Sequence, residues 1–142
     1  MTKQSFQSTV TALGFSITLE AEFIGPDLAI KIFGGDHPHI GTVCFVDQTG
    51  DIQDRPFPSH DNRLHKDGIL AKQILTIIKD SLPGLCVVLA GVHVDQISQR
   101  QLAMTSEMTQ QLGQRLHTWL SQVEVNWSQP KYYGANEQPK KE

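Results

Sequence analysis

The chain has 142 residues, 39% of them hydrophobic and 19% charged, and a formal net charge of −3. This length suits a single domain with one hydrophobic core, and the charge excludes the strongly basic surface of a nucleic-acid-binding protein. No stretch reaches the roughly 18 consecutive apolar residues of a membrane span, and the first residues lack the apolar core of a signal peptide. We therefore expect a cytoplasmic protein with no nucleic-acid or membrane partner, built as one domain over residues 1–130 with a polar, mobile tail over residues 131–142.

Strand patterns fill the first third of the chain, where apolar side chains alternate with polar ones. The predicted strands are residues 5–11, 15–23, 28–33 and 40–46. The turn Gly25-Pro26-Asp27 predicts that the second and third strands form a hairpin. Residues 51–66 are polar and carry two prolines, which predicts a long loop or a loop with a short strand.

Two amphipathic helices are predicted in the second half of the chain. The first begins at Lys66 or Asp67 and is stopped by Pro83-Gly84; its apolar stripe is Ile69, Leu70, Ile74, Ile77, Ile78 and Leu82. The second has Ser98 as its N-cap and spans residues 99–122; its stripe is Leu102, Met104, Met108, Leu112, Leu116, Trp119 and Leu120.

Residues 85–90, between the helices, form a nearly continuous apolar run, which predicts a central strand buried on both faces. Residues 123–127 predict a last edge strand. The order of the elements predicts an α+β fold, a mostly antiparallel sheet with two main helices packed on one face. Cys44 and Cys86 each lie inside an apolar run, so we expect two buried thiols, with a disulfide open only if their strands are neighbours.

Two groups of polar residues follow two of the predicted strands. Residues 34–41 read GGDHPHIG, and residues 91–95 read GVHVD. The pair Gly34-Gly35 allows positive φ, and the backbone amides of such a turn can cradle a phosphate; a plain turn is the alternative. Because both groups end strands, they are predicted to form two halves of one site.

The histidines of these groups are the main candidates for chemistry. His37 and His39 point the same way in an extended segment, which Pro38 favours, and can hold a metal or a polar ligand. His93 and Asp95 have the same spacing, so the carboxylate can orient the imidazole; Asp95 capping the turn before the second helix is the alternative. His37, His39, His93 and Asp95 together make a plausible set of ligands for a divalent metal.

A third motif, His65-Lys66-Asp67, precedes the first predicted helix. Free amides at a helix start favour anions, and Arg63 and Lys66 add positive charge for a phosphate. The alternative is a solvated loop in which Asp67 is the N-cap. No Gly-x-Ser-x-Gly elbow or other activated nucleophile is present in the sequence.

These motifs, in this order and spacing, resemble the small D subunit of gallate-type hydroxyarylic acid decarboxylases, the LpdD-like family of prenylated-flavin chaperones. The resemblance rests on GGxxPHIG at residues 34–41, HKD at 65–67 and GVHVDxI at 91–97, and it extends over about residues 10–133. It implies a non-catalytic accessory protein that binds prenylated flavin mononucleotide (FMN), or FMN, made by a separate flavin prenyltransferase. Such a protein would protect the cofactor or hand it to the large decarboxylase subunit, which acts on aromatic acids such as gallate or protocatechuate with a divalent metal.

The cofactor-binding residues expected on chemical grounds are Gly34, Gly35, His37, His39, Ile40, Gly41, Arg63, His65, Lys66, His93 and Asp95. Ile40, Val92 and Val94 are expected to line an apolar slot for the flavin ring. A homodimer would help to enclose so large a planar ligand. Two alternatives stay open: a metal-dependent enzyme that uses His37, His39, His93 and Asp95, and a structural decarboxylase subunit that does not touch the cofactor.

Overall fold

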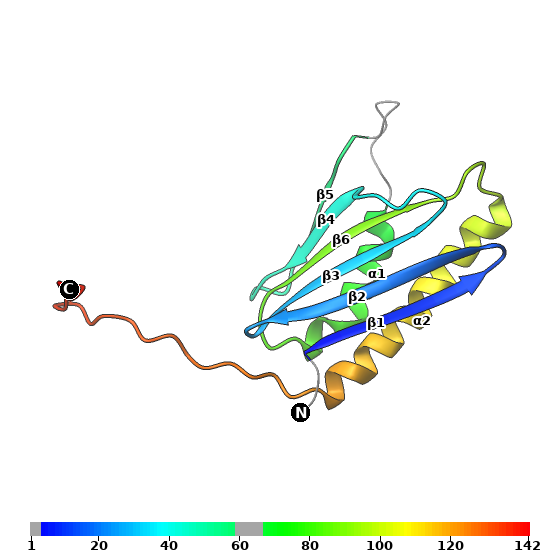
Figure 1. The fold of residues 1–142 in the computed structure, drawn as a ribbon. Coiled ribbons are helices and arrows are strands. Elements are labelled where there is room, and N and C mark those ends of the chain that lie inside the picture. Colours follow the sequence, from blue (N-terminus) through cyan, green and yellow to red (C-terminus); the bar gives the residue numbers. More distant parts are fainter. Residues whose placement is uncertain (1–3, 59–66) are drawn as a thin grey trace.

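A computed structural model describes residues 4–58 and 67–142 of the chain. Figure 1 shows one twisted sheet with both long helices lying against the same face. In chain order the elements are β1 (Ser5–Ala12), β2 (Phe15–Ile24), β3 (Asp27–Gly35), β4 (Thr42–Val46), β5 (Ile52–Pro56), α1 (Gly68–Ile78), the short 3-10 helix η1 (Lys79–Ser81), β6 (Cys86–His93) and α2 (Gln99–Gln122). None of the helices in the described ranges has the length and apolar character needed to cross a membrane.

The six strands lie in the order β1-β2-β3-β6-β4-β5, and every neighbouring pair is antiparallel except β3 and β6. The predicted α+β fold with a mostly antiparallel sheet is therefore confirmed. In the parallel pair, Gly35 lies beside His93, so the C-terminal ends of β3 and β6 meet at one end of the sheet. Thr42, which begins β4, pairs with Ala90 at the same end. This end collects both sequence motifs.

The connection from β3 to β4 has to cross β6, because β6 lies between them in the sheet. We call residues 36–41 the crossing segment. It passes over Gly91, where a Cβ atom would lie 1.8 Å from the carbonyl oxygen of His39. Only glycine leaves room for a backbone to approach so closely, which explains this residue in the middle of a strand.

Alternation along the strands builds the core. On β2, Phe15, Ile17 and Leu19 are buried against the helices, and the intervening residues face the other way. The helices contribute Ile74, Leu75, Ile78, Met108, Leu112 and Leu116 to the same core. Ser98 caps α2 in a capping box with Gln101, as its sequence position predicts; the two residues exchange side-chain hydrogen bonds with each other's backbone amide at 3.0 Å.

The buried faces of the helices differ in part from the predicted stripes. Ile69 and Leu102 are well exposed, at 66% and 59%. On α2 the buried face includes Thr105 and Thr109, whose hydroxyls donate to the carbonyls of Leu102 and Thr105. Because those hydroxyl groups are satisfied inside the helix, the threonines can be buried, and an apolar pattern alone misses them.

Two predictions about strands are wrong: one about the burial of the strand at residues 85–90, and one that residues 123–127 form a strand. The segment at 85–90 is central, but no helix or strand of the described part of the chain covers its second face, and Val87 is 42% exposed. Residues 123–127 form no strand; Val123 and Val125 pack against the core without pairing to the sheet, and Glu124 accepts a hydrogen bond from the Gln4 side chain through its carbonyl. The remainder of the chain runs away from the body in extended form (Figure 1).

Both cysteines are buried and free, as expected, and no disulfide joins them. Burial raises the pKa of each thiol to about 12. At Cys44 a hydrogen bond to Asp54, at 3.2 Å, adds to this effect. Asp54 also accepts from the buried Thr42 hydroxyl and lies 3.8 Å from the ammonium of Lys72, so a small polar cluster ties β4, β5 and α1 together.

Candidate functional site

The first part of the site forms where β3 and β6 end. After Gly35 the amides of Asp36 and His37 both donate to the carbonyl of His93, at 2.6 and 3.2 Å. In return, a carboxylate oxygen of Asp36 accepts a hydrogen bond from the amide of Asp95, at 2.8 Å. These reciprocal bonds lock the start of the crossing segment to the end of β6. We call Asp36, His37, His93 and Asp95 the histidine corner.

One carboxylate bridges two imidazoles in this corner. Nε2 of His37 lies 3.0 Å from Oδ2 of Asp95, and Nε2 of His93 lies 3.0 Å from Oδ1. An ionised carboxylate can only accept, so each ring carries its hydrogen on Nε2 and has Nδ1 as its second polar atom for a ligand. The rings lie 5.5 Å apart, centroid to centroid, at 55° to one another.

The side chains of His37, His93 and Asp95 are each more than half exposed, so a ligand can reach them. The hydrogen bond from His37, with a smaller one from His93, holds the pKa of Asp95 below its ordinary value. The expectation that His93 and Asp95 lie together is therefore confirmed. Asp95 lies in the turn after β6, and Ser98 caps α2 as predicted.

His39 does not join this corner. Its Nδ1–H donates to the carbonyl of His37 at 3.0 Å, and its Nε2 lies 3.4 Å from Oδ2 of Asp67. The prediction that His37 and His39 point the same way is wrong, because the crossing segment is not a strand and its two imidazoles turn to carboxylates on different elements.

Asp67 has a different role from the predicted N-cap. It stands at the N-cap position of α1 but makes no side-chain capping bond. Its Oδ1 instead accepts from the amide of Val92 at 3.0 Å, and Oδ2 faces His39. One largely buried carboxylate thus joins the start of α1 to β6 and to the crossing segment.

The glycines of the motifs have packing roles. A Cβ at Gly34 would lie 2.1 Å from the carbonyl oxygen of Ser16, and one at Gly35, where φ is +77°, would lie 2.1 Å from that of His93. The two amides that follow the pair already donate to His93. The backbone of Gly41 forms two hydrogen bonds: its amide donates to the carbonyl of Ala90, and its carbonyl accepts from the amide of Phe57.

Exposed apolar side chains lie at the same end of the sheet as the corner. Ile40 is 57% exposed and Phe57 is 42% exposed, and the Gly41–Phe57 backbone bond holds their segments side by side. Val92 is half-buried, whereas Val94 belongs to the core and does not line an open slot as predicted. Sequence reasoning missed Phe57 and the Asp36 carboxylate; the position of Asp36 inside the GGDHPHIG motif was the available signal for the latter.

The remaining predicted residues divide as follows. Arg63, His65 and Lys66 lie outside the residues that the structure describes. Within the described ranges, no three His, Cys, Asp or Glu side chains are grouped so that they could hold a metal ion. His37 and His93 share Asp95, whereas His39 lies at Asp67, so the four proposed metal ligands are divided between two places.

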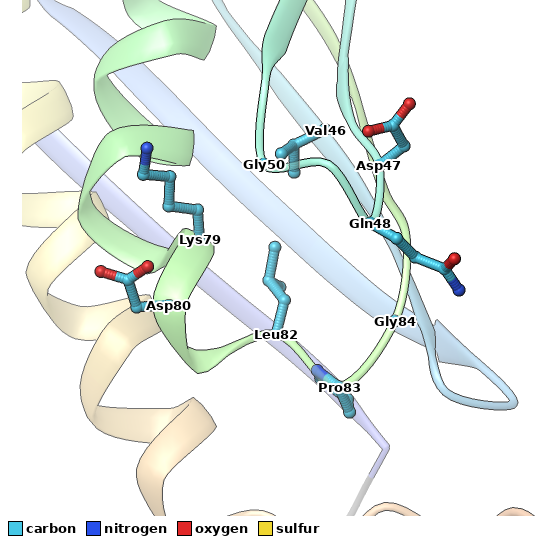
Figure 2. Close-up of a pocket in the computed structure, with 9 residues that line it drawn as sticks. All are labelled: Val46, Asp47, Gln48, Gly50, Lys79, Asp80, Leu82, Pro83 and Gly84. Carbon is cyan, nitrogen blue, oxygen red and sulfur yellow. The ribbon is translucent and has the colours of Figure 1, made fainter.

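Two hollows lie away from the corner. Figure 2 shows one of about 370 Å³, between the β4–β5 turn and the segment after α1, with Val46, Lys79, Asp80 and Leu82 on its walls. Val46 pairs with Cys86, at the opposite end of the sheet from His93, so this hollow is no part of the candidate site. The second, about 750 Å³, includes residues of the uncovered sheet face such as Glu20, Lys31 and Leu89.

Two of the comparisons with known proteins identify a family, and a third concerns the fold. The family model of the prenylated flavin chaperone LpdD-like domain matches residues 11–121. Protein LpdD of Lactiplantibacillus plantarum is 36% identical over 132 residues, which cover 93% of this chain and 97% of that protein. A chain in the crystal structure of a novel chaperone complex for yeast 20S proteasome assembly has a similar fold, with a TM-score of 0.55 and 12% identity over 84% of this chain and 99% of that one. The last likeness concerns the fold alone, whereas the first two show that this chain belongs to the LpdD-like family of prenylated flavin chaperones.

Proposed function

We propose that this protein binds prenylated FMN, or FMN, protects it, and delivers it to a prenylated-flavin-dependent decarboxylase of the gallate type. The observation that carries the proposal is the family match, which spans the strands and helices that build the histidine corner. The identity to LpdD over nearly the whole chain supports the same function. The proposed partners are the large decarboxylase subunit and the flavin prenyltransferase that makes the cofactor, all in the cytoplasm.

The histidine corner and its apolar neighbours suit a flavin ring. An isoalloxazine ring has two apolar faces and a polar edge, and ligand sites commonly combine apolar walls with a few placed polar groups. Ile40 and Phe57 supply exposed apolar surface, and His37 and His93 supply imidazoles whose orientation Asp95 fixes. We therefore place the ring against these residues.

The phosphate needs positive charge or free amides. The amides of Asp36 and His37 are engaged with the His93 carbonyl, so we assign the phosphate to cations and not to the Gly34-Gly35 turn. Arg63, His65 and Lys66 remain the proposed partners on sequence grounds, since they directly precede α1. Gly34, Gly35 and Gly41 shape the backbone around the ligand.

An accessory role fits the chemistry of the corner better than catalysis does. Both carboxylates of the corner are engaged: that of Asp95 accepts from His37 and His93, and that of Asp36 accepts from the amide of Asp95. A bound prenylated flavin supplies covalent chemistry to a decarboxylase, whereas this chain's residues are proposed only to bind, orient and shield it. No observation among the described residues favours the metal-dependent alternative.

The test is co-expression with a flavin prenyltransferase, anaerobic purification, and absorbance and mass spectrometry of the released small molecule. Near-stoichiometric prenylated FMN is expected, and transfer to the apo-decarboxylase should restore its activity. The double variant His37→Ala/His93→Ala should raise the dissociation constant for the flavin at least about tenfold, because two polar contacts of about 1 kcal/mol each are lost. His117→Ala, a histidine of α2 on the helical side, is the matched control. A colourless wild-type protein would overturn the proposal and favour the structural subunit.

A further inference from the structure

One face of the sheet is covered by α1 and α2, and the other, which we call the open face, has no covering layer among residues 4–58 and 67–142 (Figure 1). The strand registers show which side chains lie side by side on it. One row across β1, β2, β3, β6, β4 and β5 is Ser5, Glu22, Ala29, Val87, Phe45 and Gln53. The next row is Gln7, Glu20, Lys31, Leu89, Val43 and Arg55.

These rows have a mainly apolar centre and charged sides. The apolar residues lie on β3, β6 and β4, with Val87 and Leu89 on the central strand β6. Lys31 on β3 is the charged residue among them, and its ammonium lies 2.9 Å from the carboxylate of Glu20. On one side β2 presents Glu20 and Glu22, and on the other side β5 presents Arg55. The outermost strand, β1, presents only polar side chains on this face. A single sheet with an apolar centre needs a second layer to cover it.

We propose that the second layer is the open face of another copy of this chain, in a twofold dimer whose axis runs along β6. Packed sheets keep their strands roughly aligned, which this axis allows. It places β2 of one copy over β5 of the other. Glu20, which also pairs with Lys31 of its own copy, and the neighbouring Glu22 then bring acidic charge toward Arg55 of the second copy, twice by symmetry.

The shapes match along the same axis. Ala29 of one copy faces Phe45 of the other, so a small side chain meets a large one, and Val87 and Leu89 meet their own copies on the axis. β1 overhangs the partner and keeps its polar face in water. An axis in the same plane but perpendicular to the strands would place β2 over β2 and bring Glu20 and Glu22 against acidic residues, which charge repulsion disfavours.

The same axis brings the two histidine corners together. This axis keeps the strands of both sheets running in the same direction. His93 lies on the same face of β6 as Val87 and Leu89, so it lies close to His93 of the second copy. The crossing segments also lie on this face, over Gly91, and hold the two sheets apart there. The cofactor site is then a gap lined by both copies; this last step rests on the proposed function, whereas the pairing of the sheets does not.

The first test is the mass of the full chain in solution by light scattering and sedimentation equilibrium. A dimer, twice 15.8 kDa, is expected. Arg55→Glu should raise the dimer dissociation constant at least about tenfold, since like charges then face each other at two places. The double variant Glu20→Arg/Arg55→Glu should restore part of the association, because it restores opposite charges across the interface but removes the Glu20–Lys31 pair within each copy. Arg100→Glu, an exposed charge reversal on α2, is the control. A monomeric wild type, or equal effects of Arg55→Glu and Arg100→Glu, would overturn the proposal.

Crosslinking gives a second readout that does not depend on a charge variant folding well. Val87→Cys should crosslink to its own copy with a short bis-maleimide, because Val87 lies on the proposed axis. The native thiols are buried and do not compete. Leu102→Cys, exposed on α2, should stay uncrosslinked, and the reverse pattern refutes the axis. A dimer that purifies without flavin refutes the proposed function alone, and a monomer that carries flavin refutes the pairing alone.

Discussion

Asp67 joins three parts of the site, so its removal is the sharpest test of how the site is built. Its side chain is only 10% exposed. Asp67→Ala leaves the amide of Val92 without its acceptor and removes a negative charge from the start of α1. Asp67→Asn keeps an oxygen for Val92 and removes only the charge. The two variants therefore separate the hydrogen bond from the charge.

The size of each effect can be estimated from these contacts. Leaving a buried amide unsatisfied costs about 1–3 kcal/mol, and a charge at a helix N-terminus contributes about 0.3–1 kcal/mol. Asp67→Ala should thus lower the free energy of unfolding by about 1–4 kcal/mol, or Tm by about 4–12 °C for a chain of this size. Asp67→Asn should cost about 1 kcal/mol or less, about 3 °C in Tm.

Urea and thermal unfolding measure both values, and amide hydrogen exchange at Val92 reports the bond itself. Exchange at Val92 should accelerate in Asp67→Ala and change much less in Asp67→Asn. Asp51→Ala, which removes an exposed carboxylate, is the control and should stay within about 0.5 kcal/mol of wild type. Equal losses in the alanine and asparagine variants would refute the role given to the hydrogen bond.

Two further predictions follow from shifted pKa values. The hydrogen bonds from His37 and His93 lower the pKa of Asp95 in the folded state. The ionised carboxylate therefore stabilises the folded protein at pH values above the pKa of an unfolded Asp, about 3.9. This stabilisation is lost as the pH falls through the lowered pKa of the folded state. Asp95→Asn should therefore be less stable than wild type at neutral pH and converge with it in acid; parallel acid unfolding curves would contradict this. Burial raises the pKa of Cys44 and Cys86 to about 12, so only about one thiol in ten thousand is ionised at pH 8. Iodoacetamide should therefore label these thiols only after unfolding, which mass spectrometry would show. Labelling of the native protein at the rate of free cysteine would contradict the buried positions.

Local patterns predicted most of the elements, because their cause lies within a few residues. The alternation at 15–23 and 28–33 and the turn between them correctly predict the β2–β3 hairpin. Apolar spacing and the Ser98 cap correctly predict α2. The order of the strands could not be predicted this way, since β6 inserts between β3 and β4 and no local pattern encodes which strands pair across such a separation.

The contacts of the candidate site were likewise predictable only where they are local in the sequence. The spacing of His93 and Asp95 predicts their contact, which is local. That Asp95 also bonds His37, and that His39 turns to Asp67, depends on where the crossing segment passes over β6. Likewise, an apolar run at 85–90 shows that the strand is central, but it cannot show that Val87 faces an uncovered side of the sheet.

The parallel pairing of β3 with β6 has a consequence for how the protein folds. β1, β2 and β3 can form from adjacent segments, but β6 reaches β3 only after the chain has closed a long loop that contains β4, β5 and α1. Such closures are slow relative to hairpin formation, because ordering the loop precedes the gain from the contacts. The bond between His37 and Asp95 spans that closure and is absent from any chain that has formed only its hairpins. A partly folded molecule would therefore lack the paired imidazoles, and the cofactor binding proposed for them would select chains that have completed the sheet.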